Sequence, residues 1–306
     1  MPDTHVLILG SGPAGYSAGI YTARAGLETT LLTGPTPGGQ LILTHKIENY
    51  PGFSDIAGAD LMTSFQQQAQ TVGVNIVMEK ADKVDLSERP FQITTDAGTV
   101  WRAQTLIIAT GASPRWLGAP GEDTFRGHGI SVCATCDGFF YRNKKVLIIG
   151  DGNTAAYEAL FLAKVASSVT IIARNNRLSG EYTLIQQVLN NPKIHIVWET
   201  KVTSFLGTDK LTGVRCRHLT TDQETTIEAD GVFEAIGHSP NTSLFAGQLA
   251  MDDKGYLITN KQTGETSVKG VFAAGDCQEV LHRQAIIAAG SGALAALSAE
   301  KFLTTR

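Results

Sequence analysis

The sequence predicts an α/β protein made of two Rossmann-like units, the second inserted into the first. Three observations support this prediction. The motif Gly10-Ser-Gly12-Pro-Ala-Gly15 follows a short apolar run, the pattern returns 140 residues later at Gly150-Asp-Gly152, and further apolar runs end in glycine. A strand, a glycine turn and a helix in this order form a dinucleotide-binding unit, so the repeat indicates two nucleotide sites.

The elements follow in chain order. Residues 6–9 are continuously apolar, which is typical of a parallel strand buried on both faces, and residues 14–25 are small and favour a helix. The further runs predicted as strands are residues 30–33, 106–111, 146–149, 170–173, 232–237 and 271–275.

Two breaks rich in proline mark the expected domain boundaries, at Ser113-Pro114 and at Ser239-Pro240-Asn241. If both lie between domains, residues 1–115 and 244–306 form one domain and residues 116–243 form the inserted one. A chain that crosses twice between domains can form a hinge, because a few linker residues absorb a rotation.

Composition agrees with this class and excludes others. A length of 306 residues suits two domains, and 42% hydrophobic residues, 18% charged residues and 32 glycines suit α/β cores with tight turns. The 25 Lys and Arg residues are outnumbered by 29 Asp and Glu residues, and no block of like charges occurs. We therefore do not expect the positive electrostatic field that nucleic-acid binding needs. The uncharged residues 285–299 are fewer than the ~20 that span a bilayer, and no secretory signal is present. We expect a cytoplasmic protein with no nucleic acid and no membrane partner.

Each glycine of the first motif has a physical role. Gly10 permits the tight turn, Gly12 lets the backbone approach a pyrophosphate, and Gly15 lets helix and strand pack closely. The acidic residue that commonly follows the second strand is absent, and Thr33-Gly34 stands there. The alternative is a purely structural turn, against which the repeat and the later Gly275-Asp276 turn argue.

Cys133-Ala-Thr-Cys136 is the sharpest chemical signal. Two thiols three positions apart at a helix start can close a disulfide ring, and a helix N-terminus lowers a thiol pKa. Asp137 is either a proton carrier for thiol exchange or an ordinary first-turn residue. The alternative interpretation is that the two cysteines form half of a zinc site, which would need two more ligands. Cys216 and Cys277 have no partner at ligand spacing and no His-x3-His pair exists, so no metal is expected.

Further motifs complete a family pattern. They are Gly38-Gly-Gln-Leu41, Glu48-Asn-Tyr-Pro-Gly52, Cys133-Ala-Thr-Cys-Asp-Gly138, Gly150-Asp-Gly-Asn-Thr-Ala155, Gly237-His-Ser-Pro-Asn241, and Gly275-Asp276 with Arg283-Gln-Ala285. Together with the first glycine motif they resemble low-molecular-weight bacterial thioredoxin reductase over essentially the whole chain. The resemblance implies a flavoprotein with two dinucleotide-binding domains: an FAD domain from the two chain ends and a nicotinamide-type domain between them that holds the redox disulfide. It also implies a homodimer.

The resemblance assigns site residues. The implied FAD contacts are Gly10, Ser11, Gly12, Pro13, Ala14, Gly39, Gln40, Asn49, Ala109, Thr110, Gly111, Gly275, Asp276, Arg283, Gln284 and Ala285. The implied contacts of the second nucleotide are Gly150, Gly152, Asn153, Thr154, Ala155, Tyr157, Arg174, Arg177, Ile236 and Gly237.

The resemblance also implies a mechanism. Electrons pass between a nucleotide donor, FAD, the Cys133–Cys136 disulfide and a thioredoxin-like protein. Cys136 faces the flavin, Cys133 attacks the disulfide of the protein substrate, and Asp137 supplies or accepts the proton. The disulfide and the second nucleotide share one domain, so a hinge rotation must alternate them at the flavin.

The second nucleotide site departs from the family pattern. Relatives that use NADPH carry H-R-R-x-x-x-R after the second strand, where the basic groups hold the 2′-phosphate. Here the run is Ala173-Arg174-Asn-Asn-Arg177-Leu-Ser179, which keeps one motif arginine and adds Arg177. Each charge-assisted hydrogen bond that is lost removes about 1.5–3 kcal/mol of phosphate binding. NADPH use is therefore in question.

Tyr157 is a second departure from the family pattern, since the family commonly has Glu at this position. The tyrosine ring either stacks on the flat ring of a ligand or packs against its own helix. Three alternatives to NADPH stay open: NADH, a ferredoxin donor, or a second FAD in the nicotinamide site. The last would be a diflavin-linked disulfide oxidoreductase, in which electrons run from a dithiol partner to flavin. A redox sensor would need an appended effector domain, and we expect the two nucleotide units and the C-terminal helix to take up the 306 residues. A ferredoxin–NADP reductase of related fold would not need the cysteine pair.

Overall fold

The computed structural model describes residues 1–44 and 46–305 and divides the chain into two compact units. Unit 1 comprises Met1–Ser113 and Ser239–Arg306, and unit 2 comprises Pro114–His238. The boundaries therefore fall at 113/114 and 238/239, earlier than the expected 115/116 and 243/244. The physical reason is that the chain passes between the units through paired strands, and the division falls inside those strands.

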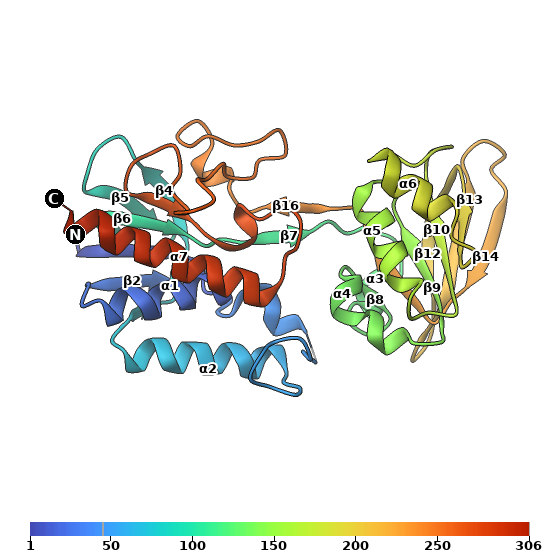
Figure 1. Ribbon diagram of the computed structural model, residues 1–306, viewed down its shortest axis with the longest axis horizontal. Helices are drawn as coiled ribbons and strands as arrows, with labels where there is room; N and C mark the ends of the chain where they lie inside the picture. The colour runs from blue at the N-terminus through green and yellow to red at the C-terminus, as the bar shows by residue number, and fades with distance from the viewer. Residues whose placement is uncertain (45, 306) are drawn as a thin grey trace. The chain divides into compact units, whose positions relative to one another are not determined.

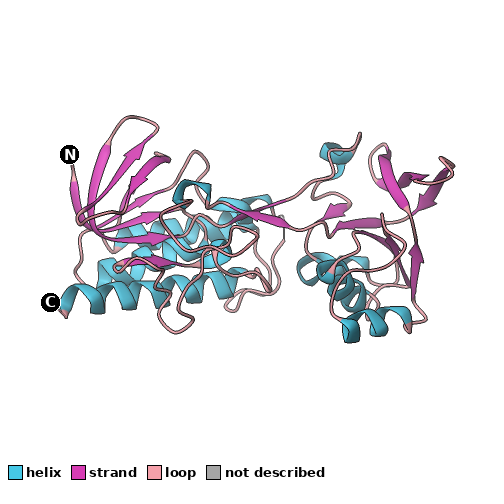
Figure 2. Ribbon diagram, turned by 90° about the horizontal axis from the view of Figure 1, so that it is seen from above, coloured by secondary structure: helices cyan, strands magenta, loops and turns pink. Residues whose placement is uncertain are grey.

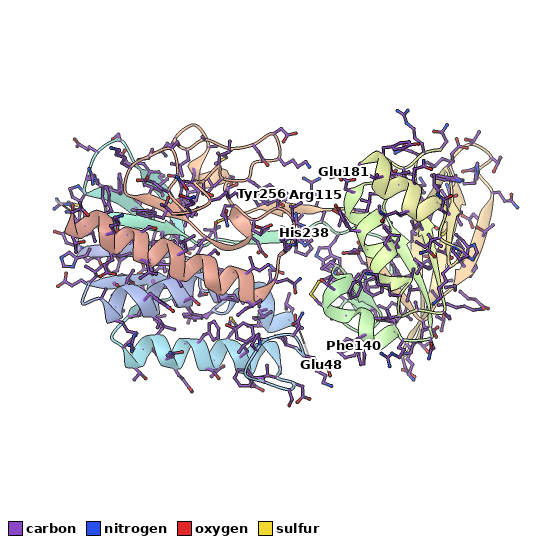
Figure 3. All side chains as sticks on the ribbon, viewed as in Figure 1. Glu48, Arg115, Phe140, Glu181, His238 and Tyr256 are labelled. Atoms are coloured by element: carbon purple, nitrogen blue, oxygen red, sulfur yellow. A yellow bond between two sulfur atoms is a disulfide. The ribbon has the colours of Figure 1, made fainter. Side chains whose placement is uncertain are left out.

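These linker strands are β7 (Ala112–Pro114) and β16 (His238–Pro240), which pair as a two-stranded sheet (Figure 1). The Arg115 amide donates to the Gly237 carbonyl at 2.9 Å, which extends the pairing beyond β7. Arg115 and His238 are labelled in Figure 3. Proline fits here because a two-stranded ribbon consists of edge strands, where a missing N–H leaves no partner unsatisfied.

Unit 1 is built on a seven-stranded mixed sheet of order β3-β2-β1-β6-β5-β4, with β17 also paired to β6. The first half of β6 pairs antiparallel with β5, and its second half pairs parallel with β17. The strands are β1 Asp3–Leu9, β2 Thr29–Leu32, β3 Asn75–Val77, β4 Ala81–Asp85, β5 Phe91–Thr95, β6 Val100–Ile108 and β17 Val271–Ala273.

The central strand β1 is buried on both faces, as its continuous apolar run predicts. Val6 and Ile8 pack with helices α1 (Pro13–Arg24), α2 (Gly58–Thr71) and α7 (Ala285–Thr304), which gather on one side of the sheet (Figure 2). Leu7 and Leu9 face a second cluster on the opposite side, which includes residues of β5, β6 and the segment 245–257. Short 3₁₀ turns complete the unit: η1 Gly39–Leu43, η3 Ser243–Phe245 and η4 Gly275–Cys277.

Helix α7 packs closely on α1, and its small apolar residues permit this close approach. A Cβ on Gly292 would lie 2.1 Å from the Ala14 carbonyl oxygen, and Ala295 and Ala299 are fully buried. By length and composition alone this helix is also apolar enough to cross a membrane, with 33% of the apolar window buried. The contacts with α1 place its inner face in the core of unit 1.

Unit 2 repeats the design with a five-stranded parallel sheet of order β11-β10-β9-β15-β8. Val146 and Ile148 of β9 pack with α5, whereas Leu147 and Ile149 face the three-stranded antiparallel sheet β12-β13-β14. The strands are β8 Ile130–Ser131, β9 Lys145–Ile149, β10 Ser168–Ile172, β11 Ile194–Val197, β12 Thr200–Gly207, β13 Leu211–His218, β14 Glu224–Glu228 and β15 Gly231–Glu234. The helices are α3 Glu122–Phe125, α4 Ala134–Asp137, η2 Gly138–Tyr141, α5 Asn153–Leu162 and α6 Tyr182–Leu189.

The order β9-α5-β10 in unit 2 matches β1-α1-β2 in unit 1, so the predicted repeat is present. The predicted fold class of two Rossmann-like domains, one inserted in the other, is confirmed.

Candidate redox and nucleotide-binding sites

The β1–α1 turn of unit 1 has one closed side and one open side. Gly10 has a φ of 108°, and a Cβ there would lie 2.3 Å from the Ala109 carbonyl oxygen; a Cβ on Gly15 would lie 1.8 Å from the Gly10 carbonyl oxygen. Around Gly12, by contrast, no described atom beyond the neighbouring residues of the chain lies within 4 Å of an added Cβ. The outer glycines thus serve the turn and the packing, and Gly12 leaves the backbone accessible to a ligand.

The start of α1 is suited to an anion. Its N-cap is Gly12, no described side chain caps it, and its first turn contains no acidic residue. The first N–H groups of a helix have no intrahelical partner, so phosphate oxygens fit there.

Distant segments join this turn. A Cβ on Gly39 would lie 3.4 Å from the Cα of Gly12, and one on Gly275 would lie 2.9 Å from the Cβ of Ala14. The fold therefore brings η1, η4 and the first glycine motif together, as the predicted FAD site requires. The other predicted residues of these segments are Pro13 at the start of α1, Gln40 in η1, Gly111 after β6 and Ala285 at the start of α7.

Two hydroxyl groups at this site differ in their partners. Ser11 Oγ donates to the Thr33 carbonyl at 3.1 Å and accepts from the Gly38 amide at 3.1 Å, so it ties the turn to the end of β2. Thr110 Oγ1 is buried without a partner among the described residues. Of the two hydroxyls, Thr110 is therefore the one whose proton is still available to donate to a ligand.

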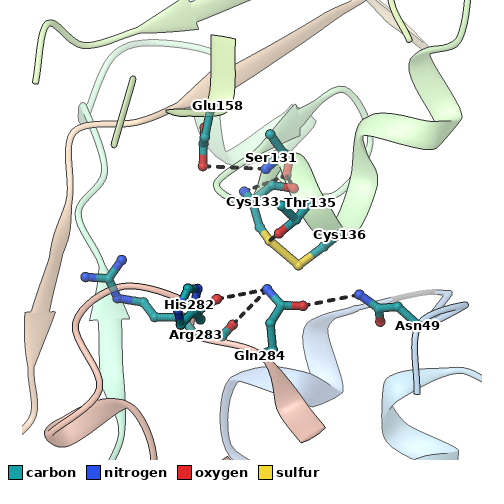
Figure 4. Close-up of a disulfide and its surroundings, with 10 residues drawn as sticks. Asn49, Ser131, Cys133, Thr135, Cys136, Glu158, His282, Arg283 and Gln284 are labelled. Atoms are coloured by element: carbon teal, nitrogen blue, oxygen red, sulfur yellow. Dashed lines mark hydrogen bonds between the residues drawn. A yellow bond between two sulfur atoms is a disulfide. The ribbon is translucent and has the colours of Figure 1, made fainter. Parts of the chain in front are cut away.

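The start of α7 adds polar groups to unit 1. Asn49 Nδ2 donates to Gln284 Oε1 at 3.2 Å, and Gln284 Nε2 donates to the His282 carbonyl at 3.0 Å (Figure 4). Asn49 and Gln284 are thus held together although their separation in the chain is large. Both were predicted as FAD contacts, and that role stays a prediction.

Asp276 is the acidic residue that the sequence predicts for the unit 1 site. Burial raises its pKa to about 6, against the opposing effect of Arg283 and with a further increase from Glu279. Arg283 Nη2 donates to the hydroxyl of Tyr256 at 3.1 Å, and Tyr256, which is labelled in Figure 3, is 2% exposed. Tyr256 was not predicted, because an isolated tyrosine in a loop carries no sequence signal.

The predicted cysteine pair forms a disulfide in unit 2, with Cα atoms 5.3 Å apart (Figure 4). Cys133 is the N-cap of α4, which has only four residues. The expectation that a helix N-terminus lowers the thiol pKa is therefore weakened, since one turn has a small dipole. Cys136 is exposed and Cys133 is half-buried.

Neighbouring groups fix the backbone of this turn. The Cys133 amide donates to Ser131 Oγ at 3.1 Å, and the Ala134 amide is 3.5 Å from its acceptor, Glu158 Oε1. Thr135 Oγ1 lies 3.3 Å from Cys133 Sγ. Ser131 and Glu158 were not predicted; the sequence signal for Glu158 was its place in the helix after the second glycine motif.

Asp137 adjoins the disulfide and is suited to hold a proton. Burial raises its pKa, and a hydrogen bond with the Ser131 side chain partly opposes this. A carboxyl that stays protonated above the usual range can donate to a departing thiolate. This environment favours the proton-carrier interpretation over the ordinary first-turn residue.

The second glycine motif has the same backbone design. Gly150 has a φ of 142°, and a Cβ there would lie 2.6 Å from the Ala235 carbonyl oxygen. Beyond the neighbouring residues of the chain, the nearest described atom to an added Cβ on Gly152 is the Ser179 carbonyl oxygen, at 3.9 Å. Ala155, in place of a third glycine, is fully buried in the packing of α5 on the sheet. Asn153 and Thr154 form the first turn of α5, and Ile236 and Gly237 follow β15.

The residues beyond β10 border a surface hollow of about 410 Å³, lined by Asn175, Asn176, Arg177 and Ser179. Arg174 and Arg177 are exposed, and Tyr157 is 53% exposed on α5. The predicted second-site residues thus surround one end of the unit 2 sheet. Among residues 1–44 and 46–305 no group of three His, Cys, Asp or Glu side chains is placed to hold a metal.

Comparisons with known proteins place these sites in a family. A family profile described as pyridine nucleotide-disulphide oxidoreductase matches residues 4–292. The chain is 50% identical to thioredoxin reductase of Rickettsia felis over 304 residues, which covers 98% of both chains. It is 45% identical to thioredoxin reductase of Coxiella burnetii, covering 99% of this chain and 97% of that one.

A solved structure agrees in fold. Thioredoxin reductase from Giardia duodenalis superposes with a TM-score of 0.95 at 37% identity, covering 99% of this chain and 100% of that one. The resemblance predicted from the motifs is confirmed. The chain belongs to the thioredoxin reductase family and is an FAD-dependent disulfide oxidoreductase of that type.

Proposed function

We propose that the protein passes electron pairs from a nicotinamide dinucleotide held by unit 2 to FAD held by unit 1, then to the Cys133–Cys136 disulfide and to a disulfide of a thioredoxin-like protein. The observation that supports this most directly is a disulfide turn in a chain with two accessible glycine turns, at Gly12 and Gly152. The name shared by the relatives supports the thioredoxin-like partner.

The residues of unit 1 fit FAD. The start of α1 at Gly12 suits the pyrophosphate, and the buried Thr110 hydroxyl has no partner among the described residues. Asp276 and Gln284 supply polar groups at the starts of η4 and α7. When bound, FAD supplies the two-electron chemistry that links a dinucleotide to a disulfide.

The cysteines exchange a disulfide with the partner. Two electrons and two protons convert the Cys133–Cys136 disulfide into two thiols. The Cys133 thiolate then attacks one sulfur of the partner disulfide, which forms a mixed disulfide and releases a partner thiolate. The Cys136 thiolate attacks Cys133 Sγ, which restores the disulfide and releases the partner as a dithiol. Asp137 gives the proton that a departing thiolate needs.

The same proposal includes the assembly and the location. We infer a cytoplasmic homodimer whose partner is a thioredoxin-like protein, without nucleic acid or a membrane. The formal charge of −4 supports the absence of a nucleic-acid partner, and the similarity to thioredoxin reductases supports the rest of the inference.

A second candidate function places another FAD in the unit 2 site and runs electrons from a dithiol to flavin. The exposed Tyr157 ring favours it, because an aromatic ring beside a nucleotide turn can stack on a flavin. A ferredoxin-like donor is a further variant that needs no second nucleotide.

Anaerobic titration of the purified holoenzyme tests the proposal. NADH and NADPH are added in separate runs while flavin absorbance is followed, and a thioredoxin-like disulfide is then added. We expect one dinucleotide to bleach the flavin and the disulfide to restore the absorbance. If neither dinucleotide bleaches a flavin that dithiothreitol reduces, the proposal fails. Two FAD per chain would then favour the diflavin enzyme, and one FAD would favour a ferredoxin-like donor.

A further inference from the structure

The second glycine motif of unit 2 contains a carboxylate between its two glycines. Asn175 Nδ2, just beyond β10, donates to Asp151 Oδ2 at 2.6 Å. We propose that Asp151 and Asn175 together recognise the adenosine ribose of the dinucleotide and select a free 2′-hydroxyl over a 2′-phosphate. This inference rests on the proposed function, because it concerns the dinucleotide held by unit 2.

The backbone on both sides of the pair is held firmly. The Ser179 amide and Oγ both donate to the Asp151 carbonyl, at 2.7 and 3.2 Å. The Glu181 amide donates to Asn153 Oδ1 at 2.8 Å, and Gly180 with a φ of 156° allows this close approach (Figure 3 labels Glu181). The glycine turn and the segment 175–181 are therefore joined before any ligand binds, and the Asp151 carboxylate has a defined position between them.

A carboxylate at this place suits a ribose with free hydroxyls. In a Rossmann unit the adenosine ribose lies between the glycine turn and the end of the second strand, and an acidic residue at that strand end accepts hydrogen bonds from its hydroxyls. The corresponding residues after β10 are Ala173, Arg174 and Asn175, and none is acidic. Asp151 supplies the missing acceptor from the glycine turn, and the Asn175 amide orients it.

The same pair disfavours a 2′-phosphate. A phosphate beside the Asp151 carboxylate meets a like charge, and the Asn175 amide already donates to that carboxylate. Arg174 and Arg177 are exposed, so water screens much of their attraction for a phosphate. The adjoining hollow of about 410 Å³ leaves room for a phosphate. The negative charge of Asp151, and not a lack of space, therefore disfavours the 2′-phosphate.

Binding of the oxidised dinucleotides tests this without turnover. NAD⁺ and NADP⁺ are titrated into the oxidised holoenzyme by calorimetry, at low and at high salt. We expect NAD⁺ to bind at least about tenfold more tightly at low salt, and Asp151→Asn to shift the ratio about tenfold towards NADP⁺. Because Asp151 is only half-buried, salt screens part of its charge, and the shift should shrink at high salt.

Further variants separate charge from orientation. Asn175→Arg adds a phosphate partner and should increase NADP⁺ affinity, whereas Asn175→Ala should weaken NAD⁺ without improving NADP⁺. Asp209→Asn, which removes the same charge from an exposed loop of unit 2, is the matched control and should leave both affinities unchanged. Far-UV circular dichroism and flavin absorbance check that each variant is folded. The hydrogen bonds from Ser179 end on the Asp151 carbonyl and not on its carboxylate, so Asp151→Asn should keep them.

Two results would overturn the inference while the proposed function stands. One is a wild-type protein that binds NADP⁺ at least as tightly as NAD⁺ and whose flavin is bleached by NADPH. The other is an unchanged NAD⁺ to NADP⁺ ratio in a folded Asp151→Asn variant. If neither dinucleotide binds or bleaches the flavin, both the inference and the proposed function fail.

Discussion

The two glycine turns share one backbone design but differ in the residue between their glycines. Ser11 in unit 1 and Asp151 in unit 2 both link the turn to the segment after the second strand, through Thr33 and Asn175. In unit 1 the link is a neutral hydroxyl, and in unit 2 it is a charged carboxylate. The two turns thus share their backbone geometry and differ in the charge of this one side chain, which is the difference on which the proposed dinucleotide preference rests.

The units also differ at the end of a central strand. Ala109 and Ala235 occupy equivalent places against Gly10 and Gly150, so the preceding residues, Ile108 and Glu234, are equivalent as well. Both are buried, yet one is apolar and the other is a carboxyl. Burial and the nearby Glu122 raise the pKa of Glu234 to about 7, against smaller opposing effects of the Leu117 amide and Arg126. At this position unit 2 therefore contains a titratable group where unit 1 has an apolar side chain.

The largest expected effect separates the redox role of unit 2 from the flavin role of unit 1. Cys136→Ser removes one sulfur of the disulfide, so turnover of a protein disulfide should fall on the order of 10³-fold or more while FAD stays bound. Cys216→Ala is the matched control, because Cys216 is a buried thiol of the same unit outside the disulfide. Stopped-flow kinetics and the flavin spectrum measure both. Undiminished turnover in Cys136→Ser would contradict the assignment of the disulfide.

A smaller loss is expected when the proton carrier is removed. Asp137→Asn keeps the shape of the side chain but cannot ionise, so disulfide exchange should slow about 10²-fold. Since the pKa of Asp137 is raised, the wild-type rate should decline at a pH above the ordinary carboxyl range, and the variant should lack this limb. A variant with the same pH–rate profile as the wild type would exclude the proton role.

A matched pair of glycine variants tests the comparison of the two turns directly. Gly12→Ala and Gly152→Ala place a methyl group where no described atom beyond the neighbouring residues lies closer than 3.9 Å, so both should fold but impede a pyrophosphate. One lost phosphate contact corresponds to about tenfold weaker binding. We expect Gly12→Ala to weaken FAD alone and Gly152→Ala to weaken the dinucleotide alone, measured by flavin content and by dinucleotide titration. If each variant weakens both ligands, the assignment of one nucleotide to each unit is wrong.

The smallest effect on turnover is expected for Glu234→Gln. This variant is tested by its free energy of unfolding instead. The folded pKa of Glu234, about 7, exceeds the ordinary 4.5, so its stabilising contribution is complete below pH 4.5 and is lost as the pH rises through 7. Glu234→Gln does not ionise, so it should raise the free energy of unfolding at pH 8 by at most about 3 kcal/mol and have little effect at pH 4.5.

Thermal unfolding at both pH values, with saturating FAD, measures this difference. Glu228→Gln, an exposed residue of β14, is the control and should show no such pH dependence. A gain that is equal at the two pH values would argue against a raised pKa at Glu234.

Much of the fold and part of the site were predictable from the sequence because their signals are local. Gly10 and Gly150 adopt positive φ values that other residues rarely tolerate, and the apolar runs before them are recognisable as buried parallel strands. The Cys133–Cys136 pair needed only a spacing of three residues. The structure divides the chain a few residues before the expected domain boundaries, because a proline signals a break but not the strand pairing that surrounds it.

The sequence by itself determined the two-unit architecture, the redox pair and the family, since each depends on short motifs whose conformation neighbouring residues fix. Only the tertiary structure decided which side chains meet across long separations: Asn49 with Gln284, Arg283 with Tyr256, and Asp151 with Asn175. These contacts depend on how strands and helices pack, and a shift of a few ångströms would break them. The charge at the second nucleotide site is such a case, because Asp151 gains its place only when β9 and β10 lie side by side.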